Sequence, residues 1–212
     1  MWLYRGQSRA DWPLVPKAGR PPYDTKNDLL RLREWKANAR PYVKDKPDSI
    51  WEWLALAQHY GFATRLLDWS YNPLVALYFC VIENEDCDGA VYVHFSDIYV
   101  NDNLDPMTAN GVDFVATFRP PIIDARIKAQ SAMFTFHGRP NVPMTSRPIN
   151  APPMTCDNLY KIVVPKIAKQ VIKIEIDMYG ITDDFIYPGL EGVSKYINRC
   201  TAGIHMNEKY MS

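Results

Sequence analysis

The stretch that most constrains the fold is residues 58–80, which reads QHYGFATRLLDWSYNPLVALYFC. Reactive and polar side chains stand here among leucines and aromatic residues: His59, Thr64, Arg65, Asp68 and Ser70. Burying a charged group without a partner costs several kcal/mol, so each of these groups must be paired or functional. The stretch therefore predicts both the centre of the core and the place of a site.

The composition predicts a single folded domain. The 212 residues are 47% hydrophobic and 23% charged, which excludes a disordered chain and allows a sizeable core. Lys+Arg and Asp+Glu both number 24, so no net charge attracts nucleic acid or a membrane surface. We find no apolar run of about 20 residues, no signal peptide and no zinc-ligand spacing, and expect a cytoplasmic protein without a metal.

The pattern of elements predicts an α+β domain. Strands are expected at residues 2–4, 63–69, 89–95, 112–118, 131–137 and 160–164, and helices at 26–42, 50–59, 73–82, 166–179 and 193–200. No regular βαβ alternation and no dinucleotide-binding glycine motif is present. We therefore expect one compact domain, a small mixed or antiparallel sheet with packed helices.

Three of these helices begin at capping signals. Thr25 precedes the first as a variant of the capping box, and Ser49 with Glu52 forms a complete box. Asn72 followed by Pro73 places an asparagine at the N-cap and a proline at the first helical position. The third helix is apolar on every side, which predicts that it is central to the core.

Residues 166–179 fit two patterns. Isoleucines alternate with charged residues, as in a strand, and a stripe from Ile167 to Met178 also fits one face of a helix. Pro165 before the segment and Gly180 after it favour the helix.

The first candidate for a binding residue is Arg5. It follows a short apolar strand and precedes Gly6, which allows a close approach of the backbone. A guanidinium placed at the end of this strand could bind a phosphate or carboxylate through two hydrogen bonds. The alternative is structural: Arg5 or Arg65 forms an ion pair with Asp68 inside the core.

Three further candidates have equally plain structural alternatives. His59, at the end of a helix, is either an acid or base or a residue bonded to a carbonyl. Gln130, at the mouth of a strand, either contacts a ribose hydroxyl or is solvated. Glu191, in the turn PGLEG, either presents a carboxylate to a ligand or caps a helix.

The chain resembles the FRG domain, which is named for its Phe/Tyr-Arg-Gly motif. YRG at residues 4–6, HYGFATRLLDWS at 59–70 and NPLVALYF at 72–79 carry the resemblance. Later segments extend it, so we expect an FRG domain over residues 1–200 and a C-terminal tail over 201–212. The resemblance implies a bacterial or phage defence or toxin setting.

The order of polar residues also resembles that of ADP-ribosyltransferases, in which an arginine binds an NAD phosphate and an acidic residue orients the ribose. This implies NAD as cofactor, a nucleotide-type small molecule as partner and a macromolecular acceptor. The implied catalytic residues are Arg5, His59, Thr64, Gln130 and Glu191. The implied ligand-binding residues are Arg5, Gly6, Tyr60, Arg65, Asp68, Ser70 and Arg126.

Two other functions stay open. In the first, the protein is a non-catalytic module that binds a ligand or a protein, and its Arg/Asp/His cluster is structural. In the second, it binds or processes nucleic acid through basic and aromatic residues at 31–36, although the neutral net charge argues against this.

Overall fold

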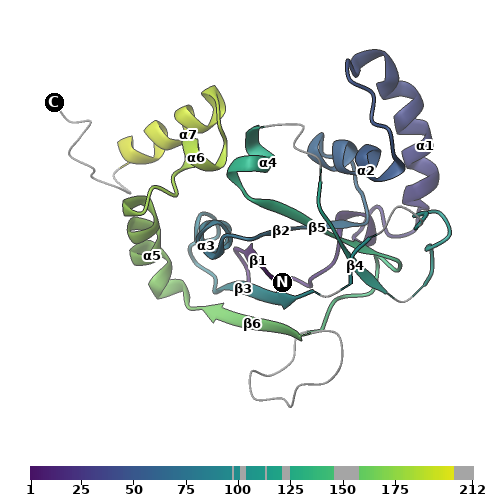
Figure 1. The fold of residues 1–212 in the computed structure, drawn as a ribbon. Helices are drawn as coiled ribbons and strands as arrows, with labels where there is room; N and C mark the ends of the chain where they lie inside the picture. The colour runs from purple at the N-terminus through teal and green to yellow at the C-terminus, as the bar shows by residue number, and fades with distance from the viewer. Residues whose placement is uncertain (97, 101–103, 113, 121–124, 146–157, 203–212) are drawn as a thin grey trace.

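The fold is known from a computed structural model that describes residues 1–96, 98–100, 104–112, 114–120, 125–145 and 158–202 (Figure 1). The strands are β1 (Trp2–Gln7), β2 (Leu66–Ser70), β3 (Gly89–Phe95), β4 (Val115–Phe118), β5 (Ala132–His137) and β6 (Asn158–Val164). The α-helices are α1 (Asp28–Ala39), α2 (Ile50–His59), α3 (Pro73–Val81), α4 (Ala125–Ala129), α5 (Lys166–Met178), α6 (Asp183–Ile186) and α7 (Leu190–Thr201). Short 3-10 helices are η1 (Lys17–Gly19) and η2 (Arg40–Tyr42).

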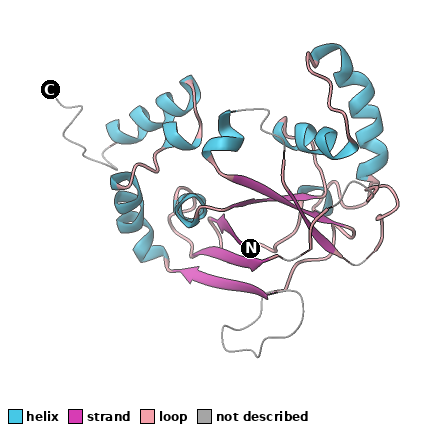
Figure 2. Ribbon diagram, in the orientation of Figure 1, coloured by secondary structure: helices cyan, strands magenta, loops and turns pink. Residues whose placement is uncertain are grey.

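The six strands form one antiparallel sheet in the order β4-β5-β2-β1-β3-β6. Helices α1 and α2 lie toward one end of this sheet, and α5 to α7 lie toward the other (Figure 2). The predicted α+β class and antiparallel sheet are confirmed. No described helix is long and apolar enough to cross a membrane.

Strand β1 lies inside the sheet, and its two neighbours hold it to different extents. Six register pairs join it to β3, whereas the register with β2 consists of Tyr4↔Ser70. The strand continues through Arg5 and Gly6 to Gln7, so the prediction that Arg5 ends the strand is wrong. Arg5 instead lies where β1 and β2 separate.

Gly6 brings α3 directly onto β1. A Cβ atom at this position would lie 1.8 Å from the carbonyl oxygen of Ala76, which is far inside van der Waals contact. Only glycine therefore permits this distance between strand and helix. The predicted cap of α3 is confirmed, because the Asn72 side chain accepts a hydrogen bond from the Leu74 N–H.

Packing covers both faces of the sheet. Helices α1 and α2 bury Leu32 and Trp51 against Leu66 and Phe136 of the sheet. Leu3, Leu67, Trp69 and Met133 share a second buried cluster. A third cluster joins α3 to the C-terminal helices and includes Val75, Tyr78, Ile176 and Ile186.

The first helix begins later than predicted. Its N-cap is Asn27, whose side chain accepts from the N–H groups of Leu29 and Leu30, and not Thr25. The helix ends at Ala39, and η2 follows it. Ser49 caps α2 as predicted, because its hydroxyl accepts from the Glu52 N–H at 3.2 Å.

The C-terminal part contains more helix than predicted. No helix was expected between Gly180 and residue 193, but α6 forms there, and α7 begins at Leu190 instead of Val193. Helix α4 was not predicted, and the segment 166–179 is helical, as its flanking residues favoured. Residue 113 of the predicted strand 112–118, and the predicted tail from residue 203 onward, lie outside the described residues.

Candidate ligand-binding site

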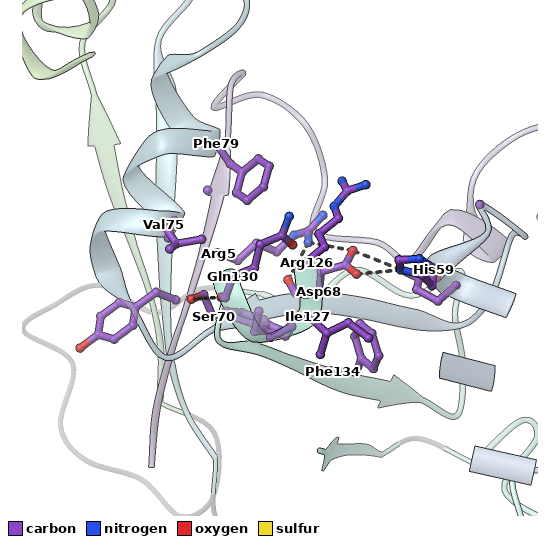
Figure 3. Close-up of a pocket in the computed structure, with 17 residues that line it drawn as sticks. Arg5, His59, Asp68, Ser70, Val75, Phe79, Arg126, Ile127, Gln130 and Phe134 are labelled. Atoms are coloured by element: carbon purple, nitrogen blue, oxygen red, sulfur yellow. Dashed lines mark hydrogen bonds and ion pairs between the residues drawn. The ribbon is translucent and has the colours of Figure 1, made fainter. Parts of the chain in front are cut away.

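A cavity of about 470 Å³ opens beside the point where β1 and β2 separate (Figure 3). Its walls come from β1, β2, β5, the end of α2, the start of α3 and the segment around α4. This volume lies within the range of small-molecule sites, about 300–1,000 Å³. Seven of the predicted site residues line it: Arg5, Gly6, His59, Asp68, Ser70, Arg126 and Gln130.

Arg5 is held at the cavity by the strand next to it. Its Nη1 donates to the main-chain oxygen of Asp68 at 2.6 Å and lies 3.6 Å from the Asp68 carboxylate. Among the described residues, its buried Nε has no hydrogen-bond partner. Burial lowers the pKa of Arg5 and the neighbouring Asp68 opposes this effect. The structural alternative of an Arg5–Asp68 pair is therefore present, and it lies at the cavity wall.

Asp68 presents a carboxylate whose position is fixed by Gln58. The Gln58 side-chain amide lies 3.1 Å from each carboxylate oxygen of Asp68, and the Thr64 hydroxyl donates to the Gln58 carbonyl. Thr64 itself is fully buried and does not line the cavity. Thr64 therefore orients the Gln58 side chain from outside the cavity.

The opposite wall is formed by the segment around α4. Ser70 Oγ donates to the main-chain oxygen of Gln130 at 2.7 Å, and the Gln130 side-chain amide donates to the Ile186 carbonyl at 3.1 Å. The Arg126 guanidinium lies 4.4 Å from the centre of the Tyr187 ring. Gln130 and Arg126 are thus oriented by contacts with the last residue of α6 and with Tyr187, which follows it.

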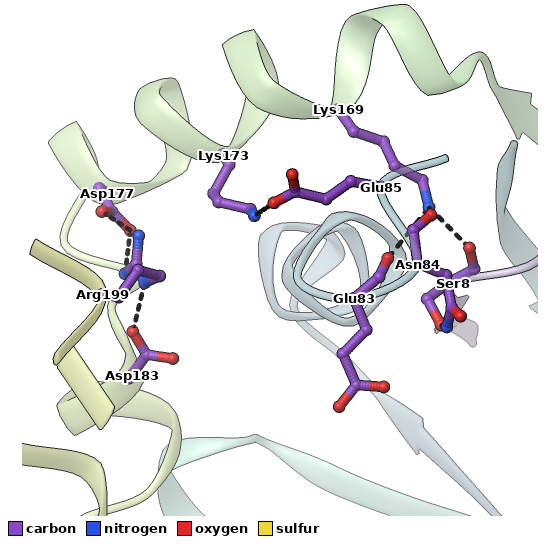
Figure 4. Close-up of polar contacts among 9 residues, drawn as sticks. All are labelled: Ser8, Glu83, Asn84, Glu85, Lys169, Lys173, Asp177, Asp183 and Arg199. Atoms are coloured by element: carbon purple, nitrogen blue, oxygen red, sulfur yellow. Dashed lines mark hydrogen bonds and ion pairs between the residues drawn. The ribbon is translucent and has the colours of Figure 1, made fainter. Parts of the chain in front are cut away.

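Buried charges attach these C-terminal helices to the rest of the domain (Figure 4). Lys169 Nζ donates to the carbonyl oxygens of Ser8, Glu83 and Asn84 at 2.6, 3.2 and 2.8 Å. Arg199 of α7 donates to the carboxylates of Asp177 in α5 at 2.8 Å and of Asp183 in α6 at 2.6 Å. These contacts hold α6 in place, and the carbonyl of its last residue, Ile186, accepts the hydrogen bond from Gln130.

Four of the predicted site residues do not line the cavity. Besides Thr64, these are Tyr60, which is 71% exposed, and Arg65 and Glu191. Arg65 forms a buried ion pair with Asp28, with 2.6 Å between Nη2 and Oδ1, so the predicted alternative of an Arg65–Asp68 pair is wrong.

Glu191 was expected in a flexed turn, but it lies in the first turn of α7. Its carboxylate accepts from Lys195 at 2.7 Å, one helical turn further along. This hydrogen bond lowers the pKa of Glu191. The side chain is exposed and paired outside the cavity.

Sequence reasoning missed the role of Gln58 and the apolar wall. Gln58 precedes His59 at the end of α2, and this proximity was the available signal. Phe79, which the apolar pattern of α3 predicted as a core residue, and Phe134 of β5 both line the cavity. The described residues contain no group of three or more His, Cys, Asp or Glu side chains that could hold a metal ion.

Fold and site together define an α+β domain with a polar cavity beside the central strand β1. The model of the FRG domain family matches residues 1–89 of this chain, which supports the resemblance that the sequence motifs predicted over this part of the chain. The matched segment contains Arg5 and Asp68, whereas Arg126 and Gln130 come from the remainder. Comparison with curated proteins found no match, and comparison with solved structures found none.

Proposed function

We propose that the cavity binds a nucleotide-type small molecule, with NAD as the specific candidate. The observation that supports this is the charge of the wall: Arg5 and Arg126 line it, and Asp68 is its one carboxylate among the described residues. Asp68 already contacts Gln58 and Arg5. Guanidinium groups in this setting favour a phosphate-bearing ligand, because they bind its oxygens through charge-assisted hydrogen bonds.

The rest of the wall suits a nucleoside. Phe79 and Phe134 provide aromatic surface, and His59, Gln58 and Gln130 provide polar groups beside it. Sites for small organic ligands combine such an apolar surface with a few polar groups that fix orientation. The base of a nucleoside would pack against the aromatic surface, and its ribose would form hydrogen bonds with the polar groups.

The proposal concerns binding. Thr64 and Glu191, which the resemblance to ADP-ribosyltransferases implied as catalytic residues, lie outside the cavity. Transfer of ADP-ribose to a macromolecular acceptor, and a defence or toxin setting, therefore stay predictions that rest on the resemblance. A non-catalytic binding module would have the same cavity and the same contacts.

Ligand-induced stabilisation tests the proposal. A ligand at 100 times its Kd stabilises a protein by about 2.7 kcal/mol, which is measurable as a shift in Tm. We expect millimolar NAD, AMP or ADP-ribose to raise the Tm of the unmodified protein, and Arg5→Gln and Arg126→Gln to reduce that shift. Arg33→Gln is the matched control, because this arginine is exposed on α1.

Two outcomes would contradict the proposal. One is the absence of a Tm shift with all three nucleotides. The other is a shift that Arg5→Gln and Arg126→Gln leave as large as in Arg33→Gln. Salt-dependent binding of oligonucleotides in place of the nucleotides would favour the nucleic-acid function instead.

A further inference from the structure

A second cavity of about 390 Å³ adjoins the first at β2. The two cavities share Arg5, Gln58 and Asp68, so these three side chains stand between them. The second cavity is also lined by Lys17 of η1 and by Arg20, which follows this short helix. No sequence motif pointed to these two residues.

Positive charge exceeds negative charge in this second cavity. Arg5, Lys17 and Arg20 line it together with one carboxylate, Asp68. Lys17 Nζ donates to the Gly61 carbonyl at 2.9 Å, and Arg20 Nε donates to the Val15 carbonyl at 2.8 Å. In the part of the chain that the structure describes, neither Lys17 nor Arg20 has a carboxylate partner.

Arg20 is affected by the charges of both Arg5 and Asp68, which line the same cavity. Burial lowers the pKa of Arg20, and the nearby charge of Arg5 lowers it further, while Asp68 acts in the opposite direction. Like charges that are held near one another in a partly buried cavity repel, and a bound anion would relieve that repulsion. The Val15 carbonyl holds Arg20 at the cavity wall without neutralising its charge.

We propose that the second cavity is a phosphate-binding site for the diphosphate group of the ligand. Lys17 and Arg20 contact the phosphates there, and Arg5 contacts them from the boundary. The inference that the nucleoside lies in the first cavity rests on the proposed function, whereas the phosphate site rests on its own residues. The favoured ligand class is then a nucleoside diphosphate or a dinucleotide, not a nucleoside.

Calorimetry with inorganic pyrophosphate tests the phosphate site without any nucleoside. We expect pyrophosphate to bind the full chain, and Arg20→Gln and Lys17→Gln each to weaken it by about tenfold or more, the typical loss for one charge-assisted hydrogen bond. Arg33→Gln is the matched control, because Arg33 is exposed on α1 and lines neither cavity. It should leave pyrophosphate binding unchanged.

The outcomes separate this inference from the proposed function. Absence of pyrophosphate binding, or weakening by Lys17→Gln and Arg20→Gln no larger than that by Arg33→Gln, overturns the phosphate site. Pyrophosphate binding that depends on Lys17 and Arg20, with no Tm shift by NAD, AMP or ADP-ribose, supports the phosphate site and overturns nucleotide binding. Lys17 is exposed, so Lys17→Gln decides the result if Arg20→Gln does not fold.

Discussion

Arg65 and Asp28 form a buried ion pair, and Arg65→Met should therefore destabilise the protein strongly. The two side chains are 1% and 3% exposed. Arg65 Nε and Nη2 donate to the two Asp28 carboxylate oxygens at 2.9 and 2.6 Å. The Gly138 carbonyl at 3.2 Å and the Asn110 side chain at 3.0 Å accept two further bonds. Methionine keeps much of the apolar volume but none of these donors.

The expected loss follows from what remains after the substitution. Asp28 would keep a buried charge without its partner, and breaking a buried ion pair in this way costs about 3–5 kcal/mol. Total stabilities of domains are about 5–15 kcal/mol, so this is a large fraction. Adding Asp28→Asn removes the unpaired charge, and the double variant should be more stable than the sum of the two single losses predicts.

Urea denaturation of the four proteins in this cycle measures the coupling directly. The slope m should stay constant, and Arg33→Gln should change the free energy of unfolding by no more than about 0.5 kcal/mol, as is usual for a surface substitution. A loss below about 1 kcal/mol for Arg65→Met, or strictly additive effects in the cycle, would refute the reasoning. NAD binding by folded Arg65 variants should persist, because Arg65 lies outside both cavities.

Three other predictions concern acid stability, the Tyr-Arg-Gly motif and the carboxylate outside the cavity. Burial lowers the pKa of His137 to about 3. Below about pH 6.5 this histidine therefore binds a proton more readily in the unfolded chain than in the folded protein. The free energy of unfolding should fall by up to about 1.4 kcal/mol per pH unit from about pH 6.5 toward 3, and His137→Gln should reduce this slope in urea titrations; an unchanged slope would show that other groups cause it. Gly6→Ala should lower the Tm sharply or prevent folding, because its Cβ would lie 1.8 Å from the Ala76 oxygen; a Tm equal to that of the unmodified protein would be inconsistent with this packing. Glu191→Gln should leave nucleotide binding unchanged in calorimetry, and a loss of binding would mean that Glu191 reaches the ligand.

Elements with local signals were predictable from the sequence. Ser49 and Asn72 each cap a helix through a hydrogen bond to an N–H two or three residues away, so the signal lies within one turn. The strand expected at residues 131–137 is likewise present as β5. These features need no knowledge of distant segments.

The partners of buried charges were not predictable, because tertiary structure sets them. Asp28 and Arg65 are 37 residues apart, and only the packing of α1 against the sheet brings them together.

The orientation of helix α5 was not predictable for the same reason. Its stripe from Ile167 to Met178 is exposed at both ends, 86% and 81%, while Lys169 is fully buried against carbonyls from distant loops. Hydropathy alone predicts the opposite orientation.

The Tyr-Arg-Gly motif combines a packing requirement with a charge at the site. Gly6 is required because α3 contacts the backbone of β1, and this contact also places the start of α3 at the cavity. Arg5 lies where β1 and β2 separate and lines both cavities. Gly6→Ala should therefore remove stability and binding together, whereas Arg5→Gln should remove binding from a folded protein. A folded Arg5→Gln variant that binds nucleotide normally would leave the motif with a structural role alone.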